Sequence, residues 1–180
     1  HLVHVQDVRN FAYRSEYDFD ERWEDRTWDL DRLASVWFVL VPLSEKWRGP
    51  AHTFVSFGFD EGSYSSISIE ARREQGERYS PVKGLFRRYE LIYVVGDERD
   101  LIGRRAVHDG TPVYLLPIKA TKEAMRLLFT EMLTRADALR EHPAFYNTLT
   151  DNCTNILLRH VDVAAPDRVR GGIAAMLPGY

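Results

Sequence analysis

Hydrophobic residues in the first two thirds of the chain fall into short segments that have the length and spacing of β-strands. Val36–Leu43 is a continuous apolar run, which is typical of a buried strand. Ala51–Phe59 and Tyr64–Arg72 enclose Asp60–Ser63, a segment with the composition of a hairpin turn. The strands predicted in this region are Val36–Leu43, Ala51–Phe59, Tyr64–Arg72, Tyr89–Val95 and Pro112–Ile118.

The segments around these strands are more polar. Charged and aromatic residues are mixed irregularly near the amino terminus, where a strand is predicted to begin within His4–Tyr13. Asp18–Thr27 is predicted to be a loop or short turn, and Lys46–Pro50 interrupts the strand pattern. The charged segment Gly96–Arg105 predicts a turn followed by a short helix.

The last third of the chain changes to a helical period. From Thr121, a predicted N-cap, apolar residues recur every three or four positions and predict an amphipathic helix that ends near His142 and Pro143. A shorter helix is predicted to begin around Cys153, with Ile156 and Leu157 on its apolar side. Strands followed by helices predict an α+β fold with an antiparallel sheet of four or five strands and two main C-terminal helices.

Length and charge narrow the class of protein. The 180 residues are predicted to form a single domain over 1–180, and 44% hydrophobic residues exclude a disordered chain. A net charge of −3 argues against nucleic acid as a partner, and no apolar run has the length of a membrane span. Because the chain begins at His1 rather than Met, we expect a fragment of a longer, membrane-associated protein.

Cys153 is the first candidate catalytic residue, as a thiolate nucleophile. As the single cysteine, it excludes an internal disulfide and a multi-cysteine zinc site. It follows a polar loop in which Thr150, Asp151 or Asn152 is suited to cap a helix, so it is predicted to lie in the first helical turn. Free backbone N–H groups there favour a thiolate, the reactive form of cysteine. A buried structural cysteine is the alternative.

A thiolate nucleophile needs a base, and His52 is the candidate among six histidines because it opens a strand that enters the core. His160 lies two helical turns after Cys153, about 10 Å away by helical rise, which is too far for direct proton transfer. If the apolar faces of the hairpin strands coincide, His52 lies opposite either Glu70 or Arg72. Glu70 is therefore the candidate third residue that orients the imidazole, with a surface ion pair as the alternative.

Two clusters of mixed charge, Glu70–Arg78 and Asp97–Arg105, are typical of solvated faces or salt-bridge networks. The alternative is a pocket for an anionic substrate. No His-x-His or HExxH spacing is present, so neither a metal nor another cofactor is predicted.

Four blocks in order, AHTFVSFGF, ISIEARREQGERYS, GLFRRYELIYVVGDERDLI and FYNTLTDNCTNI, resemble the bacterial Lnb N-terminal periplasmic domain family. The resemblance implies a periplasmic location, membrane anchoring in the full-length protein, and N-acylation of the N-terminal cysteine of lipoproteins. The chain is also similar to permuted papain-like enzymes of the NlpC and lecithin:retinol acyltransferase types. The residues carried over are Cys153 as nucleophile, His52 as base and Glu70 as the polar third member.

Three functions remain open from the sequence. The leading hypothesis is a Cys–His thiol acyltransferase with a phospholipid or lipoprotein substrate, acting at a membrane surface. The second is a cell-wall amidase or cysteine peptidase that uses the same pair of residues, and the third is a non-catalytic periplasmic binding module. An apolar groove beside Cys153 favours acyl transfer, whereas a polar cleft favours hydrolysis. The sequence leaves the oligomeric state open.

Overall fold

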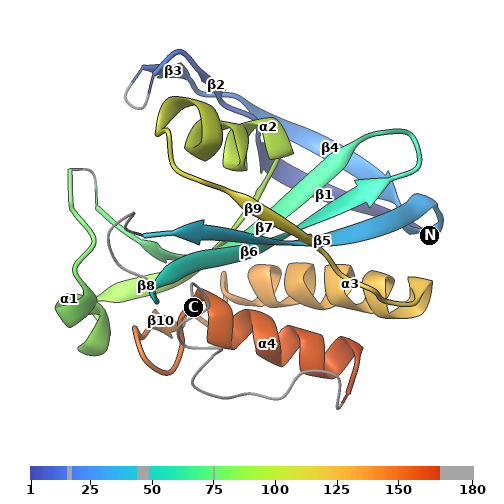
Figure 1. Ribbon diagram of the computed structural model, residues 1–180. Coiled ribbons are helices and arrows are strands. Elements are labelled where there is room, and N and C mark those ends of the chain that lie inside the picture. The colour runs from blue at the N-terminus through green and yellow to red at the C-terminus, as the bar shows by residue number, and fades with distance from the viewer. Residues whose placement is uncertain (16–17, 44–48, 75, 167–180) are drawn as a thin grey trace.

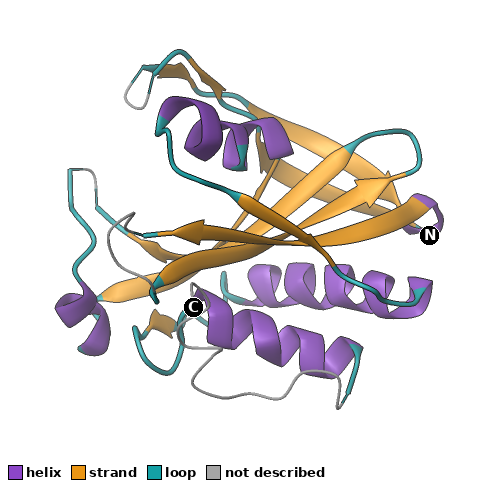
Figure 2. Ribbon diagram, in the orientation of Figure 1, coloured by secondary structure: helices purple, strands orange, loops and turns teal. Residues whose placement is uncertain are grey.

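The structure, a computed structural model, describes residues 1–15, 18–43, 49–74 and 76–166. A twisted sheet is covered on one face by α3 and α4, while α2 lies on the opposite side (Figure 1). Figure 2 shows how the two long helices run side by side beneath the strands. The fold is therefore α+β, with the long helices at the C-terminal end of the described chain, as the sequence predicts.

Within the described residues, the main sheet has eight strands in the order β4-β1-β8-β7-β6-β5-β9, with β10 paired to β8. All pairings are antiparallel except that of β1 with β8, so the sheet is mixed. A separate ribbon pairs β2 with β3. The strands are β1 (Leu2–Arg9), β2 (Ala12–Tyr13), β3 (Phe19–Asp20), β4 (Trp23–Asp29), β5 (Leu33–Pro42), β6 (Ala51–Phe59), β7 (Tyr64–Arg72), β8 (Tyr89–Gly96), β9 (Tyr114–Pro117) and β10 (Phe145–Tyr146).

The helices begin at side-chain caps that the sequence supplies. Thr121 accepts from the Ala124 N–H, which confirms the predicted N-cap of α3, and Asn152 caps α4. The first long helix ends four residues earlier than expected, at Ala138, and turns lead on towards Pro143. The helices are η1 (Leu30–Arg32), α1 (Pro81–Leu85), α2 (Glu98–Leu101), η2 (Arg104–His108), α3 (Lys122–Ala138) and α4 (Cys153–Ala164).

The sequence prediction was wrong at the amino terminus. Asp18–Thr27 is not a loop, because it contains β3 and most of β4. The polar residues of β4 hide its period, and the strand is held by pairing with β1, a long-range contact that local composition does not report. The predicted four or five strands were therefore too few. Lys46–Arg48, the first part of the predicted interruption, lies outside the described residues.

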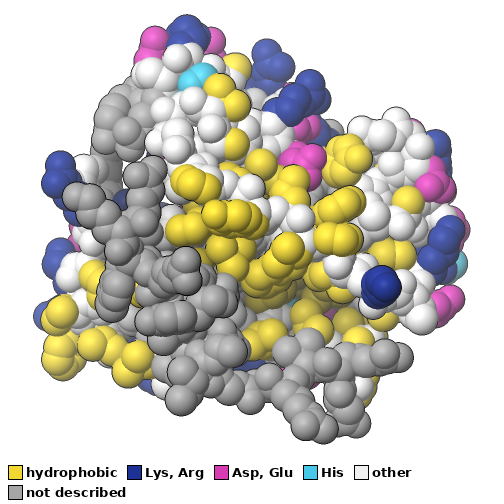
Figure 3. Space-filling view, viewed as in Figure 1, with side chains coloured by type: hydrophobic (Ala, Val, Ile, Leu, Met, Phe, Trp, Pro, Cys, Tyr) yellow, Lys and Arg dark blue, Asp and Glu magenta, His cyan; other side chains and the backbone are white. Residues whose placement is uncertain are grey.

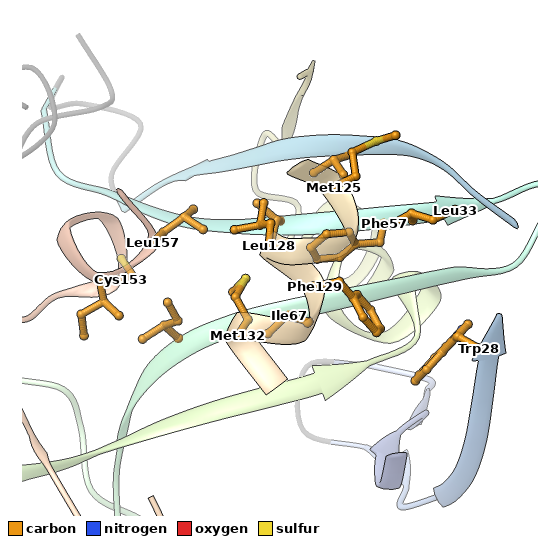
Figure 4. Close-up of a cluster of buried hydrophobic side chains, with 14 of the residues drawn as sticks. Trp28, Leu33, Phe57, Ile67, Met125, Leu128, Phe129, Met132, Cys153 and Leu157 are labelled. Atoms are coloured by element: carbon orange, nitrogen blue, oxygen red, sulfur yellow. The ribbon is translucent and has the colours of Figure 1, made fainter. Parts of the chain in front are cut away.

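Alternate residues of β6 and β7 build two separate apolar clusters. On one face, Val55, Phe57 and Ile67 join side chains of α3 and α4 in the larger cluster (Figure 4). On the other face, Phe54 packs with Leu101 of α2 in a smaller cluster that includes Val39 and Val41. The strand period of two thus gives each face its own core.

The hairpin β6–β7 opens at one end. Its pairs run from Gly58 opposite Tyr64 to Phe54 opposite Ser68, a register that would next place His52 opposite Glu70. Pairing stops before that position, although β6 continues beside β5 to Ala51 and β7 continues beside β8 to Arg72. The outer ends of β6 and β7 therefore leave a gap between them, which we call the strand gap.

Candidate active site

Cys153 is the first residue of α4, beside the strand gap. Its predecessor Asn152 accepts from the Asn155 N–H at 2.8 Å and donates to the Thr148 carbonyl at 2.9 Å, so the helix start is fixed to the preceding turn. Cys153 is 6% exposed and belongs to the larger apolar cluster (Figure 4). The thiol is thus held rigidly at a helix start, and it is both a core residue and, as described below, part of a pocket wall.

His52 is joined to Glu70 through a serine hydroxyl. His52 Nε2 lies 2.8 Å from Ser68 Oγ, which donates to Glu70 Oε1 at 2.9 Å. The direct separation between His52 Nε2 and Glu70 Oε1 is longer, at 3.7 Å. Because a serine hydroxyl has one proton and Ser68 gives it to the carboxylate, Ser68 accepts from His52 Nε2–H. This arrangement occupies Nε2 and leaves Nδ1 as the ring nitrogen that can take a second partner.

Glu70 stays ionised because cations surround it. Burial raises the pKa of this carboxyl, but the charges of His52, Arg105 and Arg9 and the Ser68 hydrogen bond outweigh that effect and lower the pKa to about 2. Arg105 Nη2 approaches Glu70 Oε1 at 3.3 Å, and its guanidinium also packs over the Phe54 ring. The carboxylate therefore remains a fixed negative charge behind the imidazole at neutral pH.

The pKa of the Cys153 thiol lies near neutral pH. Burial raises its pKa, whereas the hydrogen bond with His52, the charge of that imidazole and the Thr53 backbone N–H lower it, with a net result of about 7. Thr53 lies on β6 in the strand gap, where pairing with β7 has ended. With a pKa of about 7, a sizeable fraction of the thiol is ionised at pH 7.

Cys153, His52 and Glu70 line a single pocket of about 370 Å³. The structure therefore brings together the three residues that the sequence singled out. The ends of β5 and β6 give the pocket an apolar side, whereas η2 and the turn after it contribute polar groups. Besides the three named residues, the walls are formed by Val41, Pro42, Leu43, Ala51, Ile69, Ala71, Arg73, Tyr79, Arg105, Asp109, Thr111 and Tyr146.

Sequence reasoning missed Ser68 and Tyr146. Ser68 carries no distinctive signal beyond its place two residues before Glu70 on the same face of a strand. Tyr146 lies in the short strand β10, and burial together with the nearby Cys153 charge raises its pKa, so the phenol stays protonated. Its position seven residues before Cys153 was the available hint, although that spacing does not show that both line one pocket.

The second charged cluster forms a salt-bridge network, as predicted, but part of it is buried rather than solvated. Arg9 binds the fully buried Asp100 through two hydrogen bonds, and the Phe11 N–H donates to the same carboxylate. Asp97 accepts from Arg26 and Arg99. These residues tie β1 and β4 to α2 and lie outside the Cys153 pocket, whereas Arg105 at the end of the same cluster lines the pocket and pairs with Glu70.

Residues 19–174 match the family model of the Lnb N-terminal periplasmic domain. The chain belongs to this family. The family is one of periplasmic domains, which gives this Lnb N-terminal domain a periplasmic location. No curated protein and no solved structure matches the chain. Among the described residues of the Lnb domain, no helix has both the length and the apolar character needed to cross a membrane.

Proposed function

We propose that this Lnb N-terminal periplasmic domain is a Cys–His thiol acyltransferase. The observation that carries the proposal is the pocket in which Cys153, with a pKa lowered to about 7, adjoins His52 and the fixed charge of Glu70. A nucleophile, a base and an anion that orients the base are the three components of covalent acyl transfer. The lipoprotein N-terminal cysteine is the proposed acceptor, and an acyl ester of a phospholipid is the proposed donor.

The reaction follows a two-step route. His52 Nδ1 takes the Cys153 proton, sulfur attacks the ester carbonyl carbon, and the carbon–oxygen bond to the leaving alcohol breaks as that alcohol receives the proton from His52. The acceptor amine then attacks the thioester and gives one proton to His52. The carbon–sulfur bond breaks, and the sulfur leaves as a thiolate that recovers this proton.

Charge that develops on the carbonyl oxygen needs hydrogen-bond donors. Tyr146 supports this role because its phenol is protonated and lines the pocket beside Cys153. The first backbone N–H groups of a helix such as α4 make no intrahelical bond, and they lie at the positive end of the helix dipole. We assign the developing oxyanion to this side of the pocket.

The apolar side of the pocket supports an acyl chain rather than a polar peptide. Val41, Leu43 and Ala51 contribute hydrocarbon surface at the ends of β5 and β6. A strand-borne histidine that precedes a helix-borne cysteine is also the order found in permuted papain-like enzymes, and we propose that arrangement for this fold. Arg73, Asp109 and Thr111 on the polar side favour the second candidate, an amidase or cysteine peptidase with the same residues.

The test is intact-mass spectrometry of the domain after incubation with diacyl phospholipid in detergent. The wild type is expected to gain one acyl group on Cys153, and Cys153→Ser and His52→Ala are expected to gain none. Each buried methylene contributes about 0.8 kcal/mol, so long-chain donors should give more adduct than short-chain donors. A wild type without adduct that cleaves a peptidoglycan fragment would replace acyl transfer by hydrolysis.

A further inference from the structure

A group of large apolar side chains is exposed around α1. Phe86, the residue that ends this helix, is 74% exposed, and Val82 is 61% exposed. Leu85 is exposed beside them. Pro81 at the first helical position and Ser80 as N-cap fix the single turn, so its apolar side chains face solvent on a preformed element. Such an exposed apolar surface indicates an interaction site.

The turn before α4 continues this surface. Thr148 Oγ1 donates to the Pro81 carbonyl at 2.9 Å, and Asn147 Nδ2 donates to the Leu85 carbonyl at 3.1 Å. A Cβ on Gly84 would lie 2.2 Å from Thr148 Oγ1, so the two segments are in direct contact. Leu149 in that turn is exposed as well. We call Val82, Leu85, Phe86 and Leu149 the α1 patch.

Basic residues follow the α1 patch along the chain. Lys83, Arg87 and Arg88 are exposed, and Arg78 precedes the helix. Lys83 is paired with Glu77 at 2.8 Å, whereas no ion pair is formed by the three arginines within the described residues. In Figure 3, hydrophobic side chains gather at the lower left, where Figure 1 places α1, with Lys and Arg side chains beside them.

The backbone at Arg87 adds an independent observation. Its φ is +53°, the left-handed conformation that usually takes glycine after a helix, and its N–H donates to the Gly84 carbonyl at 3.1 Å. A side chain at this position costs stability relative to glycine. The Arg87 side chain is exposed, so its charge is accessible to a partner, although it also acts on nearby Asp151.

We propose that the α1 patch and its arginines form a docking surface for an anionic phospholipid bilayer. Apolar side chains that enter the interface, next to cations that bind lipid phosphates, are the combination that peripheral membrane binding requires. Tyr79 links this surface to the pocket, since it lines the pocket and its hydroxyl lies 3.1 Å from Thr148 Oγ1. Under the proposed function, which this inference extends but does not require, docking would bring the lipid donor to Cys153.

The test is co-sedimentation of the chain with phosphatidylcholine vesicles, with and without phosphatidylglycerol. The wild type is expected to bind the anionic vesicles and to dissociate as salt is added. Arg87→Gly is expected to weaken binding about fivefold, since a basic residue near an anionic surface contributes about 1 kcal/mol. The same variant is expected to raise the thermal midpoint, so a misfolded protein cannot explain its loss of binding. Phe86→Ser is expected to weaken binding at least as strongly.

Matched variants elsewhere on the surface serve as controls. Leu116→Ser removes an apolar side chain that is 51% exposed on β9, and Arg22→Ala removes an exposed cation from the turn before β4. Both are expected to bind like the wild type. Cys153→Ser is also expected to bind normally, so a failure of acyl transfer stays distinguishable from a failure of docking.

Three results would overturn the docking surface. The first is a wild type that binds neither kind of vesicle, and the second is equal binding by the wild type, Arg87→Gly and Phe86→Ser. The third is a Phe86→Ser variant that binds vesicles normally but loses self-association in solution or loses a lipoprotein peptide. That last result would assign the patch to a protein partner.

Discussion

The two faces of the β6–β7 hairpin differ in composition and in the elements that cover them. On one face, Val55, Phe57 and Ile67 pack against α3 and α4 in the larger apolar cluster. On the other face, Ser56 donates to a glutamate of α2, and Glu70 pairs with an arginine of η2. One pair of strands thus carries both the main apolar core and a polar network.

Because of this difference, we expect one face to determine mainly the stability of the fold and the other to determine mainly the reactivity of Cys153. Full burial of a large apolar side chain contributes about 1.5–3 kcal/mol, whereas a hydrogen bond within the fold contributes about 0.5–1.5 kcal/mol net. The polar groups of this face, as distinct from its small Phe54 cluster, therefore add little to the free energy of unfolding, but they hold the ionised Glu70 behind His52 and so affect the pKa of Cys153. Variants on the two faces should separate these effects.

The largest expected change in stability is on the apolar face. Phe57 is fully buried, and its ring meets the Phe129 ring edge to face at 4.9 Å. Phe57→Ala is expected to lower the free energy of unfolding by about 3–5 kcal/mol, measured by urea denaturation. Its Cys153 pKa, measured under native conditions, should stay near that of the wild type. A loss below about 1 kcal/mol would contradict the assignment of the main core to this face.

On the polar face, His52→Ala is expected to change reactivity more than stability. Without the imidazole, burial should return the Cys153 pKa from about 7 to at least its ordinary value near 9. The thiolate fraction at pH 7, and with it the rate of alkylation by iodoacetamide, would then fall about fiftyfold. The wild type should also react faster than a model thiol at that pH. Equal rates for the wild type and His52→Ala would show that His52 does not activate the thiol.

The smallest expected effect is a difference in the pH at which each face loses stability. Burial lowers the pKa of His160, which bonds to Tyr93 on the apolar face, so the unfolded chain takes up a proton first and stability falls below about pH 6.5. The pKa of Glu70 is lowered to about 2, so its contribution is present above about pH 4.5 and is lost as the pH falls towards 2.

Chemical denaturation at a series of pH values checks both windows. His160→Gln should flatten the dependence below pH 6.5, and Glu70→Gln should flatten it only below pH 4.5. Each group contributes a slope of at most about 1.4 kcal/mol per pH unit. If Glu70→Gln changed the slope near pH 6, the assignment of the two windows to the two faces would be wrong.

The local sequence pattern was sufficient to predict the strands and the helix that position the candidate site. The bounds predicted for Ala51–Phe59 and Tyr64–Arg72 are those of β6 and β7, and the helix predicted from Cys153 is α4. The register that places His52 towards Glu70 is the observed one of the two that the apolar pattern left open. Turn composition and a side-chain cap are local signals, which is why they could be recognised without the fold.

Features that depend on distant contacts could not be predicted. Nothing in the alternation of β6 and β7 shows that their pairing ends at Phe54 and Ser68. The bridging role of Ser68 follows from that separation, which lets a hydroxyl lie between His52 and Glu70. Strand β4 was missed for a similar reason, since only its pairing with β1 distinguishes it from a polar loop.

The strand gap also gives the protein a built-in spectroscopic reporter. The Thr53 backbone N–H, in the part of β6 that is no longer paired with β7, helps to lower the pKa of Cys153. A thiolate is a much better hydrogen-bond acceptor than the neutral sulfur of a thioester. The Thr53 amide proton should therefore exchange slowly with deuterated solvent while the thiolate persists. Acylation would neutralise the sulfur and expose the proton. Under the proposed function, exchange at this one backbone position would then distinguish the acylated protein from the free thiolate.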